Sequence, residues 1–337
     1  MTSFYLNRRR LLAGAVAAAA ISRVPMVGAQ SYPSRNMRVV IPTRQGGGAE
    51  RLARAFHEFW GPLLKTNFEY SFYPGAAGQV GYELYLNKRE KDGYNLLFGN
   101  MGPEMIMYAL RKPKYRFPQD YQYFCRMDVD DSVVFVRKDS PFRRIEDLVA
   151  EAKKRTVTVA VSRLPHPASI GVLALGRAVK AKFNLVPYGG GNPTMVAVAN
   201  GEVDCGALPI AGVAASGDRN RVLGIFNDEH KMAKYSNNAP AVNAVFGTKI
   251  PSLPSSRSWA IHAEVIEKMP EAFALLEKTS KAVFDNPAYL PAYAKTGAPV
   301  ETIQYGDRAL CTRYANHMVE LTDEYRTLLS AKRKKKS

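Results

Sequence analysis

Three short apolar runs in the first hundred residues each end in a turn of small residues, and the first two lead on into helical patterns. The first stretch, VVIPTRQGGGAERLARAFHEFW, passes through Gly46, Gly47 and Gly48 into apolar residues at helical spacing. FEYSFY (68–73) leads through PGAAGQVG into YELYLNK, and YNLLFGN (94–100) ends in GNMGP. This strand–turn–helix order predicts an α/β fold with a parallel sheet. Ligands of such sheets bind at the carboxyl ends of the strands, where these turns lie.

A second strand–helix series follows further along the chain. DSVVFVRKDSP (131–141) predicts a strand and a turn, and TVTVAVS (156–162) opens the new series. NLVPYGGGNP, VDCGALP and RVLGIFN predict further strands, and SWAIHAEV precedes a C-terminal part that is mainly helical. The pattern indicates two similar lobes, and it does not assign the C-terminal helices to either one.

Length and charge set limits on the kind of protein. The chain has 337 residues, of which 46% are hydrophobic, so it is expected to be globular with one large domain or two. The formal net charge is +17, but more than half of it lies within the first 30 residues and the tail AKRKKKS (331–337). The remaining basic residues are scattered among acids without a nucleic-acid-binding motif, so no nucleic-acid partner is expected. We interpret the tail as a solvated end, with surface adhesion as the alternative.

Residues 1–29 predict an export signal. A basic region precedes an apolar run from Leu11 to Ile21, and Val27-Gly28-Ala29 supplies small residues for signal peptidase. The run of 11 residues is too short to span a bilayer. The order Arg-Arg-x-Leu-Leu is similar to a twin-arginine signal, and a general secretory signal with extra arginines is the alternative. We expect a mature chain that begins at Gln30 and is soluble in the periplasm.

The glycine-rich turns are candidate anion sites. Glycines leave backbone N–H groups free, and a following helix adds partial positive charge at its N-terminus. The loop is neither a dinucleotide nor a Walker motif, so it either binds a small anion or is a structural turn. SRLPHPAS (162–169) ends another strand, where Ser162, Ser169 and helix amides could hold an anion. Arg44 and Arg163 lie in two such loops, either as carboxylate clamps or as solvated side chains.

Catalysis and metal binding find little support in the sequence. The five histidines lack metal-ligand spacing, and no G-x-S-x-G nucleophile motif occurs. His166, flanked by two prolines, is interpreted as a loop-shaping residue rather than a general base. The three cysteines form no C-x-x-C motif and are expected to be small packed residues. We therefore expect no enzyme, cofactor or metal, with an exported hydrolase of unrecognised site as the alternative.

At this point several ordered motifs resemble a known family. Seven motifs are similar, in their order along the chain, to those of the periplasmic receptors of tripartite tricarboxylate transporters, the Bug family. They are YPSRNMRVVIP, GGGAERLAR, YPGAAGQVG, DGYNLLFGN, SVVFVRKDSPFRRIEDLVAEAK, VPYGGGNPTMVAVANGEVD and RVLGIF. The resemblance implies a type II periplasmic binding protein, with two lobes joined by two crossing strands. It places lobe 1 at residues 31–132 plus 255–337, and lobe 2 at 133–254. A monomer that binds a small organic carboxylate and docks on membrane permease subunits is then expected, with a membrane sensor as the alternative partner.

The resemblance also implies which residues hold the ligand. In lobe 1 these are Thr43, Gln45, Gly46, Gly47, Glu50, Ala77, Gly78 and Asn100, and in lobe 2 they are Ser162, His166, Ser169 and Tyr188. Thr43 stands where the family has an aromatic residue and Glu50 where it has an aspartate, and CGALP lacks the acid that meets a ligand ammonium. An amino-acid ligand is therefore disfavoured, and Arg44 with Arg163 suggests a di- or tricarboxylate.

Overall fold

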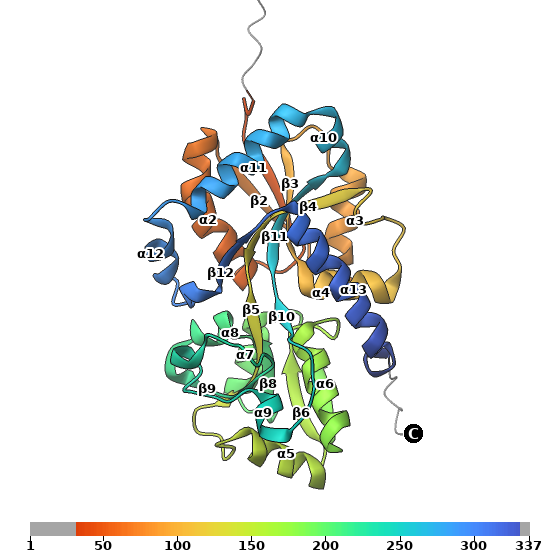
Figure 1. The fold of residues 1–337 in the computed structure, drawn as a ribbon, viewed down its shortest axis with the longest axis vertical. Helices are drawn as coiled ribbons and strands as arrows, with labels where there is room; N and C mark the ends of the chain where they lie inside the picture. The colour runs from red at the N-terminus through yellow and green to blue at the C-terminus, as the bar shows by residue number, and fades with distance from the viewer. Residues whose placement is uncertain (1–31, 331–337) are drawn as a thin grey trace, which may run out of the picture.

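Two pairs of strands pass from one sheet into another with a single residue between them. Only Val129 separates β4 (Tyr121–Asp128) from β5 (Asp130–Arg137), and only Ser256 separates β10 (Pro254–Ser255) from β11 (Arg257–His262). Because the members of each pair belong to different sheets, the two crossings join two lobes (Figure 1). The structure, a computed structural model, describes residues 32–330. The predicted export signal at 1–29 and the basic tail lie outside these residues.

Lobe 1 is built on a six-stranded sheet of order β12-β4-β11-β3-β1-β2. Its other strands are β1 (Met37–Ile41), β2 (Phe68–Phe72), β3 (Asn95–Asn100) and β12 (Ile303–Gly306). Its helices are α2 (Gly48–Leu64), α3 (Gln79–Lys88), α4 (Met101–Arg111), α10 (Ala263–Lys268), α11 (Pro270–Phe284), α12 (Tyr289–Ala294) and α13 (Arg308–Ser330). Strands β1, β2 and β3 run parallel, as the strand–turn–helix pattern predicts.

Lobe 2 holds a second six-stranded sheet, of order β10-β5-β8-β6-β7 with β9 paired to β5. Its other strands are β6 (Val157–Val161), β7 (Phe183–Pro187), β8 (Cys205–Pro209) and β9 (Asn220–Ile225). Its helices are α5 (Ile145–Lys154), α6 (Pro167–Val179), α7 (Gly191–Ala199), α8 (Ile210–Ala214) and α9 (Val242–Phe246). Strands β6, β7 and β8 are parallel.

The predicted parallel strands form only part of each sheet, because both sheets are mixed. β11 runs antiparallel to β3 and β4, and β5 runs antiparallel to β8 and β9. The crossing strands enter each sheet from the other lobe, so their direction is set by the connection between lobes rather than by a strand–helix–strand unit. The pattern analysis also missed β4, although the turn FPQD (117–120) directly precedes its segment YQYFCRMD.

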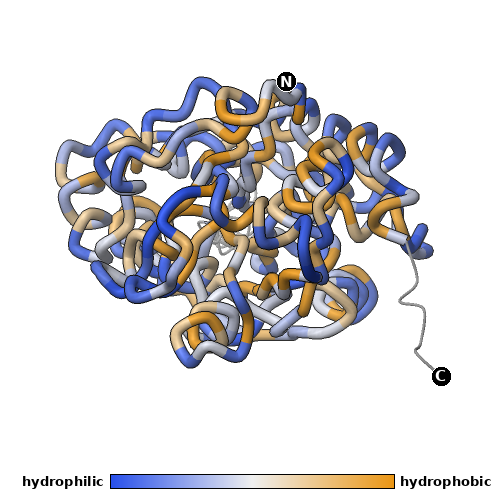
Figure 2. The backbone as a smooth tube through the Cα atoms, turned by 90° about the horizontal axis from the view of Figure 1, so that it is seen from below, coloured by the Kyte–Doolittle hydropathy of each residue, from blue (hydrophilic) through white to orange (hydrophobic). Residues whose placement is uncertain are grey.

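The core of lobe 1 explains why the residues after the glycines form a helix. Leu52, Phe56 and Trp60 of α2 recur at helical spacing and are almost fully buried. The rings of Trp60 and Trp259 meet edge-on with centroids 5.0 Å apart. Burying a side chain of this size stabilises the fold by about 1.5–3 kcal/mol. Many hydrophilic segments lie along the outline of the molecule (Figure 2).

The C-terminal helix α13 contacts both lobes. It packs against α4 and β4 of lobe 1, and its far end reaches α6 of lobe 2 (Figure 1). There the guanidinium of Arg177 lies over the ring of Tyr325, 5.3 Å from its centroid. The boundary implied by the family resemblance gives this helix to lobe 1, whereas its packing also ties it to lobe 2.

Candidate functional site

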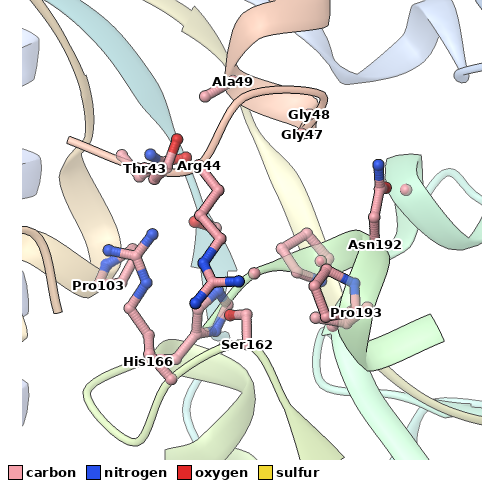
Figure 3. A pocket seen from close by; sticks show the side chains of 18 of the residues that line it. Thr43, Arg44, Gly47, Gly48, Ala49, Pro103, Ser162, His166, Asn192 and Pro193 are labelled. Carbon is pink, nitrogen blue, oxygen red and sulfur yellow. The ribbon is translucent and has the colours of Figure 1, made fainter. Parts of the chain in front are cut away.

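The carboxyl ends of the parallel strands in the two lobes face one another across a cleft. Its empty volume is about 810 Å³, part of which is open to solvent (Figure 3). Among the residues predicted for the site, lobe 1 contributes Thr43, Arg44, Gln45, Gly47 and Asn100 to its walls. Lobe 2 contributes Ser162, Arg163 and His166. An adjoining hollow, which shares four lining residues with the cleft, includes Ala77 and Gly78.

The loop between β1 and α2 is shaped by Glu50. Its carboxylate accepts a hydrogen bond from the backbone N–H of Gly46 at 2.6 Å and another from Nε of Arg54 at 2.8 Å. A carboxylate in the first turn of a helix is favoured by the partial charge of the helix N-terminus. Glu50 is buried and is not among the residues that line the cleft, so the structure gives it the role of holding the loop.

Gly46 joins the two lobes through its backbone. Its carbonyl accepts a hydrogen bond from the side-chain amide of Asn192, at the start of α7, at 2.6 Å. Gly46 adopts a φ of +81°, a conformation that favours glycine over other residues. The carbonyl of Gly46 is therefore engaged by the protein itself.

His166 faces the cleft as a neutral hydrogen-bond donor. Its Nδ1 accepts the backbone N–H of Ala168 at 3.0 Å, which caps α6 and leaves the proton of the neutral ring on Nε2. Burial, helped by the positive charges of Arg163 and Arg257, lowers the pKa of His166 to about 3. Such an uncharged ring can donate to an anion in the cleft, and it is a very weak base.

Arg163 crosses from lobe 2 to lobe 1. Its Nη1 donates to the carbonyl of Ala77 at 3.0 Å and lies 3.6 Å from the carboxylate of Glu104. Gly78 leaves the room for this contact, since a Cβ there would lie 3.0 Å from Cγ of Glu104 and 3.5 Å from Nη1 of Arg163. The guanidinium is thus already paired within the protein, unlike that of Arg44, for which the described residues offer no ion pair.

Glu104 is a buried carboxylate at the start of α4. The hydroxyl of Tyr82 donates to it at 2.7 Å, and the amide of Asn100 lies at 3.4 Å. Burial raises the pKa of Glu104 to about 7, although the nearby Arg163 and these hydrogen bonds act in the opposite direction. Near neutral pH the group is therefore only partly ionised.

Two further predicted residues do not line the cleft. Ser169 is fully buried, and its hydroxyl donates to the carbonyl of Arg163 at 3.0 Å, which shapes the loop. Tyr188 packs against the core of lobe 2 and directs its hydroxyl to Glu202 at 3.3 Å. Tyr188 directly follows β7 and lines neither the cleft nor the adjoining hollow.

Sequence reasoning missed several residues that border the cleft. Arg51, Asn192 and Arg257 line it, and Glu104 lies directly behind the wall. The sequence does contain a signal for Arg257, because a charged residue next to the apolar run SWAIH indicates a buried ion pair. Its partners Asp128 and Asp130 come from the acidic run DVDD, which had no assigned role.

The walls of the cleft are rich in cations. Arg44, Arg51, Arg163 and Arg257 are among the lining residues, and no aspartate or glutamate is. Two of these arginines have carboxylates behind them: Arg163 lies by Glu104, which is only partly ionised near neutral pH, and Arg257 is paired with Asp128 and Asp130. The arrangement can attract an anion and hold it by charge-assisted hydrogen bonds.

Other chemistries receive no such arrangement within residues 32–330. No cluster of three or more histidine, cysteine, aspartate or glutamate side chains suited to a metal ion occurs in that part of the chain. The three cysteines are buried and free, in agreement with the expectation of packed residues. None of the helices described has the length and apolar character that crossing a bilayer requires.

Two α/β lobes, joined by crossing strands around an anion-attracting cleft, define a type II periplasmic binding protein. Residues 72–316 match the model of the tripartite tricarboxylate transporter family receptor, so the chain belongs to that family. The sequence resemblance to the Bug family is thereby confirmed. The family and its structural neighbours are binding proteins of transport systems, not enzymes.

Relatives by sequence are distant. The chain is 25% identical over 201 residues to a UPF0065 protein of Pseudomonas sp., which covers 59% of this chain and 60% of that relative. It is 24% identical over 301 residues to BugT of Bordetella pertussis, which covers 87% of this chain and 90% of BugT. The match thus spans only about three-fifths of the first relative's length.

Solved structures share the fold. An adipate-bound protein of R. palustris superposes with a TM-score of 0.76 at 18% identity, covering 88% of this chain and 98% of that one. MatC of Rhodopseudomonas palustris with bound malate superposes with a TM-score of 0.72 at 20% identity, covering 89% of this chain and 100% of MatC. The periplasmic binding protein BugD superposes with a TM-score of 0.75 at 16% identity, covering 88% of this chain and 98% of BugD.

Proposed function

We propose that the protein is a periplasmic receptor that captures a small organic carboxylate in the cleft between its lobes and presents it to membrane permease subunits. The observation that carries this proposal is the charge of the cleft, which is lined by four arginines and by no carboxylate. Two proteins of the same fold hold malate and adipate. The receptor would act as a monomer after export and requires no cofactor.

The direct ligands are proposed from the residues that face the cleft. Arg44, Thr43 and Gln45 would meet the ligand from the lobe 1 loop, with Ser162 and neutral His166 opposite. Thr43 Oγ1 is buried without a hydrogen-bond partner among the described residues, so it is available to a ligand oxygen. Closing the lobes shields these contacts from water and strengthens them.

The cleft favours carboxylates over amino acids. An amino-acid ligand carries an ammonium group, and a buried ammonium needs an anionic partner. Neither the cleft nor the adjoining hollow is lined by an aspartate or a glutamate. Hydrolysis is not favoured either, because the histidine at the cleft is held neutral by burial and caps a helix.

Ligand-induced thermal stabilisation tests the proposal. Aliphatic and aromatic mono- and dicarboxylates are screened with the mature protein, and the same preparation is assayed for turnover of ester and phosphate panels. A bound carboxylate at one hundred times its Kd stabilises the fold by about 2.7 kcal/mol. A saturable rise in Tm without turnover is expected. Turnover without any carboxylate-induced shift would instead support the hydrolase.

A further inference from the structure

The last turns of α13 lie against the C-terminal end of α6 in lobe 2. Leu328 of α13 lines a small surface hollow together with Arg177 and Ala181 at the end of α6. Lys180 and Lys182 flank Ala181 in the chain. Figure 1 shows the end of α13 beside α6 in the lower part of the molecule. Three basic side chains of lobe 2 therefore lie next to the end of α13.

The C-terminal ends of α4 and α5 lie close to the same place. Nη2 of Arg326 in α13 donates to the carbonyl of Ala109 at 3.1 Å, and α4 ends two residues later. The backbone N–H of Lys182, just past α6, donates to the carbonyl of Ala152 at 2.8 Å, near the end of α5. The C-terminal ends of four helices, from both lobes, thus gather at one corner of the molecule.

Seven exposed cations lie at these helix ends without an ion pair among residues 32–330. We call this set the basic corner, and its members are Arg111, Lys112, Lys153, Lys154, Arg177, Lys180 and Lys182. Asp323 of α13 is already paired with Arg326. Glu151 of α5 is paired with Arg155, so Glu324 is left as an acid without an ion pair there. The corner therefore carries a large positive excess.

The helix dipole alone does not explain this surface. A cation near the C-terminal end of a helix is favoured by the dipole, which accounts for each side chain separately. Four such ends at one corner repel one another unless an anionic partner offsets their charge. The chain continues from the end of α13 into AKRKKKS (331–337), which adds five positive charges and no acid. Seven residues reach about 25 Å at most, so the charges of the tail stay near the corner.

The make-up of this surface favours a membrane over a protein partner. Protein interfaces have an apolar core, and none of the large hydrophobic side chains exposed in residues 32–330 belongs to these helix ends. Five of the seven charges in the corner and four of the five in the tail are lysines. Lysine is a point charge on a flexible stem, without the fixed fork of arginine. Such a surface suits a fluid array of anionic headgroups, which offers no fixed geometry.

We propose that the basic corner and the tail together form a docking surface for anionic phospholipid headgroups, which holds the exported receptor at the surface of the membrane. None of the seven cations lines the cleft, although Arg111 borders the adjoining hollow. Attachment therefore leaves the cleft free, and it takes place with or without a carboxylate between the lobes. The tail, which the sequence left as a solvated end or an adhesive segment, is adhesive in this arrangement.

Vesicle flotation with the mature protein tests the docking surface. The vesicles are phosphatidylcholine alone or phosphatidylcholine mixed with phosphatidylglycerol, at low salt and at about 0.15 M salt, where screening is stronger. The wild type is expected to bind the mixed vesicles, less tightly at the higher salt, and to leave phosphatidylcholine unbound. The double variant Lys180→Gln/Lys182→Gln should bind about tenfold more weakly, and deletion of residues 331–337 should weaken binding by more than this.

The matched control is Lys278→Gln/Lys295→Gln. It removes two exposed lysines from α11 and from the end of α12, away from α5 and α6 (Figure 1). This control should bind the mixed vesicles as the wild type does, and the thermal unfolding midpoints of all variants show that they are folded.

Four results would overturn the docking surface. They are wild-type binding by the tail deletion, wild-type binding by Lys180→Gln/Lys182→Gln, equal binding of the wild type to both kinds of vesicle, and equal weakening by the lobe 1 control. A duplex oligonucleotide is offered as a rival polyanion, and a preference for it over the mixed vesicles would overturn the lipid assignment. The carboxylate-induced rise in Tm is measured on the same variants, so the receptor function is judged separately.

Discussion

At the scale of single residues, Glu104 is a buried carboxylate whose pKa lies near neutral pH. It is 2% exposed, faces Arg163 from the other lobe, and is surrounded by Tyr82, Asn100 and the neighbouring Tyr123, whose hydroxyl bonds that of Tyr82. Burial raises its pKa from 4.5 to about 7. The folded protein therefore holds this proton more tightly than the unfolded chain.

Comparing the wild type with Glu104→Gln should isolate the part of the pH dependence of the unfolding free energy that is due to Glu104. Because the folded pKa is raised, the stabilising contribution of Glu104 is present below about pH 4.5 and is lost as the pH rises through 7. The wild type is expected to lose about 2 kcal/mol relative to the variant between pH 5 and pH 8. Urea denaturation at several pH values measures the difference. If the unfolding free energies of the wild type and Glu104→Gln ran parallel with pH, the raised pKa would be contradicted. The variant Glu58→Gln, at an exposed position, is the control whose curve should run parallel to that of the wild type.

At the scale of elements, the hinge strands are fastened by one ion cluster. Arg257 of β11 binds Asp128, at the end of β4, and Asp130, at the start of β5. Asp130 also accepts the backbone N–H of Ala211 in α8 at 2.9 Å. Burial raises the pKa of both carboxylates while Arg257 opposes the shift. The guanidinium of Arg257 therefore links both pairs of crossing strands, and through Asp130 it is connected to α8 of lobe 2.

Removing that guanidinium should destabilise the protein strongly. Arg257→Met leaves two buried carboxylates without their counter-charge, which costs about 3–5 kcal/mol at pH 7.5. The loss should be smaller at pH 5, because protonation of the carboxylates relieves it. Chemical denaturation at the two pH values is the measurement, with the exposed Arg38→Met of β1 as the control. A loss below about 1 kcal/mol at pH 7.5 would contradict this role of the cluster.

The sequence predicts the elements better than it predicts the site. β1 follows from its short apolar run, which is buried at four of five residues, and α2 follows from the helical spacing of its buried residues. β4 was missed although a turn precedes it, and only Val129 separates its end from β5. Thr43 and Ser162 could be placed at strand ends, whereas the pairing of Arg163 with Glu104 depends on how the lobes sit. Tyr188 could be placed at a strand end too, but its packing on the lobe 2 core and its hydrogen bond to Glu202 depend on the tertiary fold.

At the scale of the whole molecule, closure of the lobes is supported by contacts that the protein makes itself. Arg163 bonds to Ala77, and Asn192 bonds to Gly46, each across the cleft. On another side α13 extends from lobe 1 to α6 of lobe 2 (Figure 1). The balance between open and closed forms therefore depends on residues beyond those that would touch a ligand.

Arg163→Ala should shift that balance towards the open form. It removes the hydrogen bond to Ala77 and the ion pair with Glu104. Small-angle scattering of the ligand-free variant is expected to give a larger radius of gyration than the wild type. Carboxylate affinity should fall about tenfold, because the binding-competent closed form becomes rarer. Identical scattering curves and equal affinities would show that these contacts do not hold the lobes together.

Native mass spectrometry of the freshly purified mature protein tests the central claim most directly, which is that the cleft between the lobes holds a small organic carboxylate. The account predicts a complex of one protein with one small organic acid, either carried through purification or formed on adding a carboxylate from the screen. It also predicts that Arg44→Gln and Arg51→Gln, both at residues that line the cleft, weaken this complex. The control Arg143→Gln, just before α5 and outside the cleft lining, should not weaken it. A spectrum that shows only the free protein with every carboxylate offered, or a complex equally stable in all three variants, would contradict it.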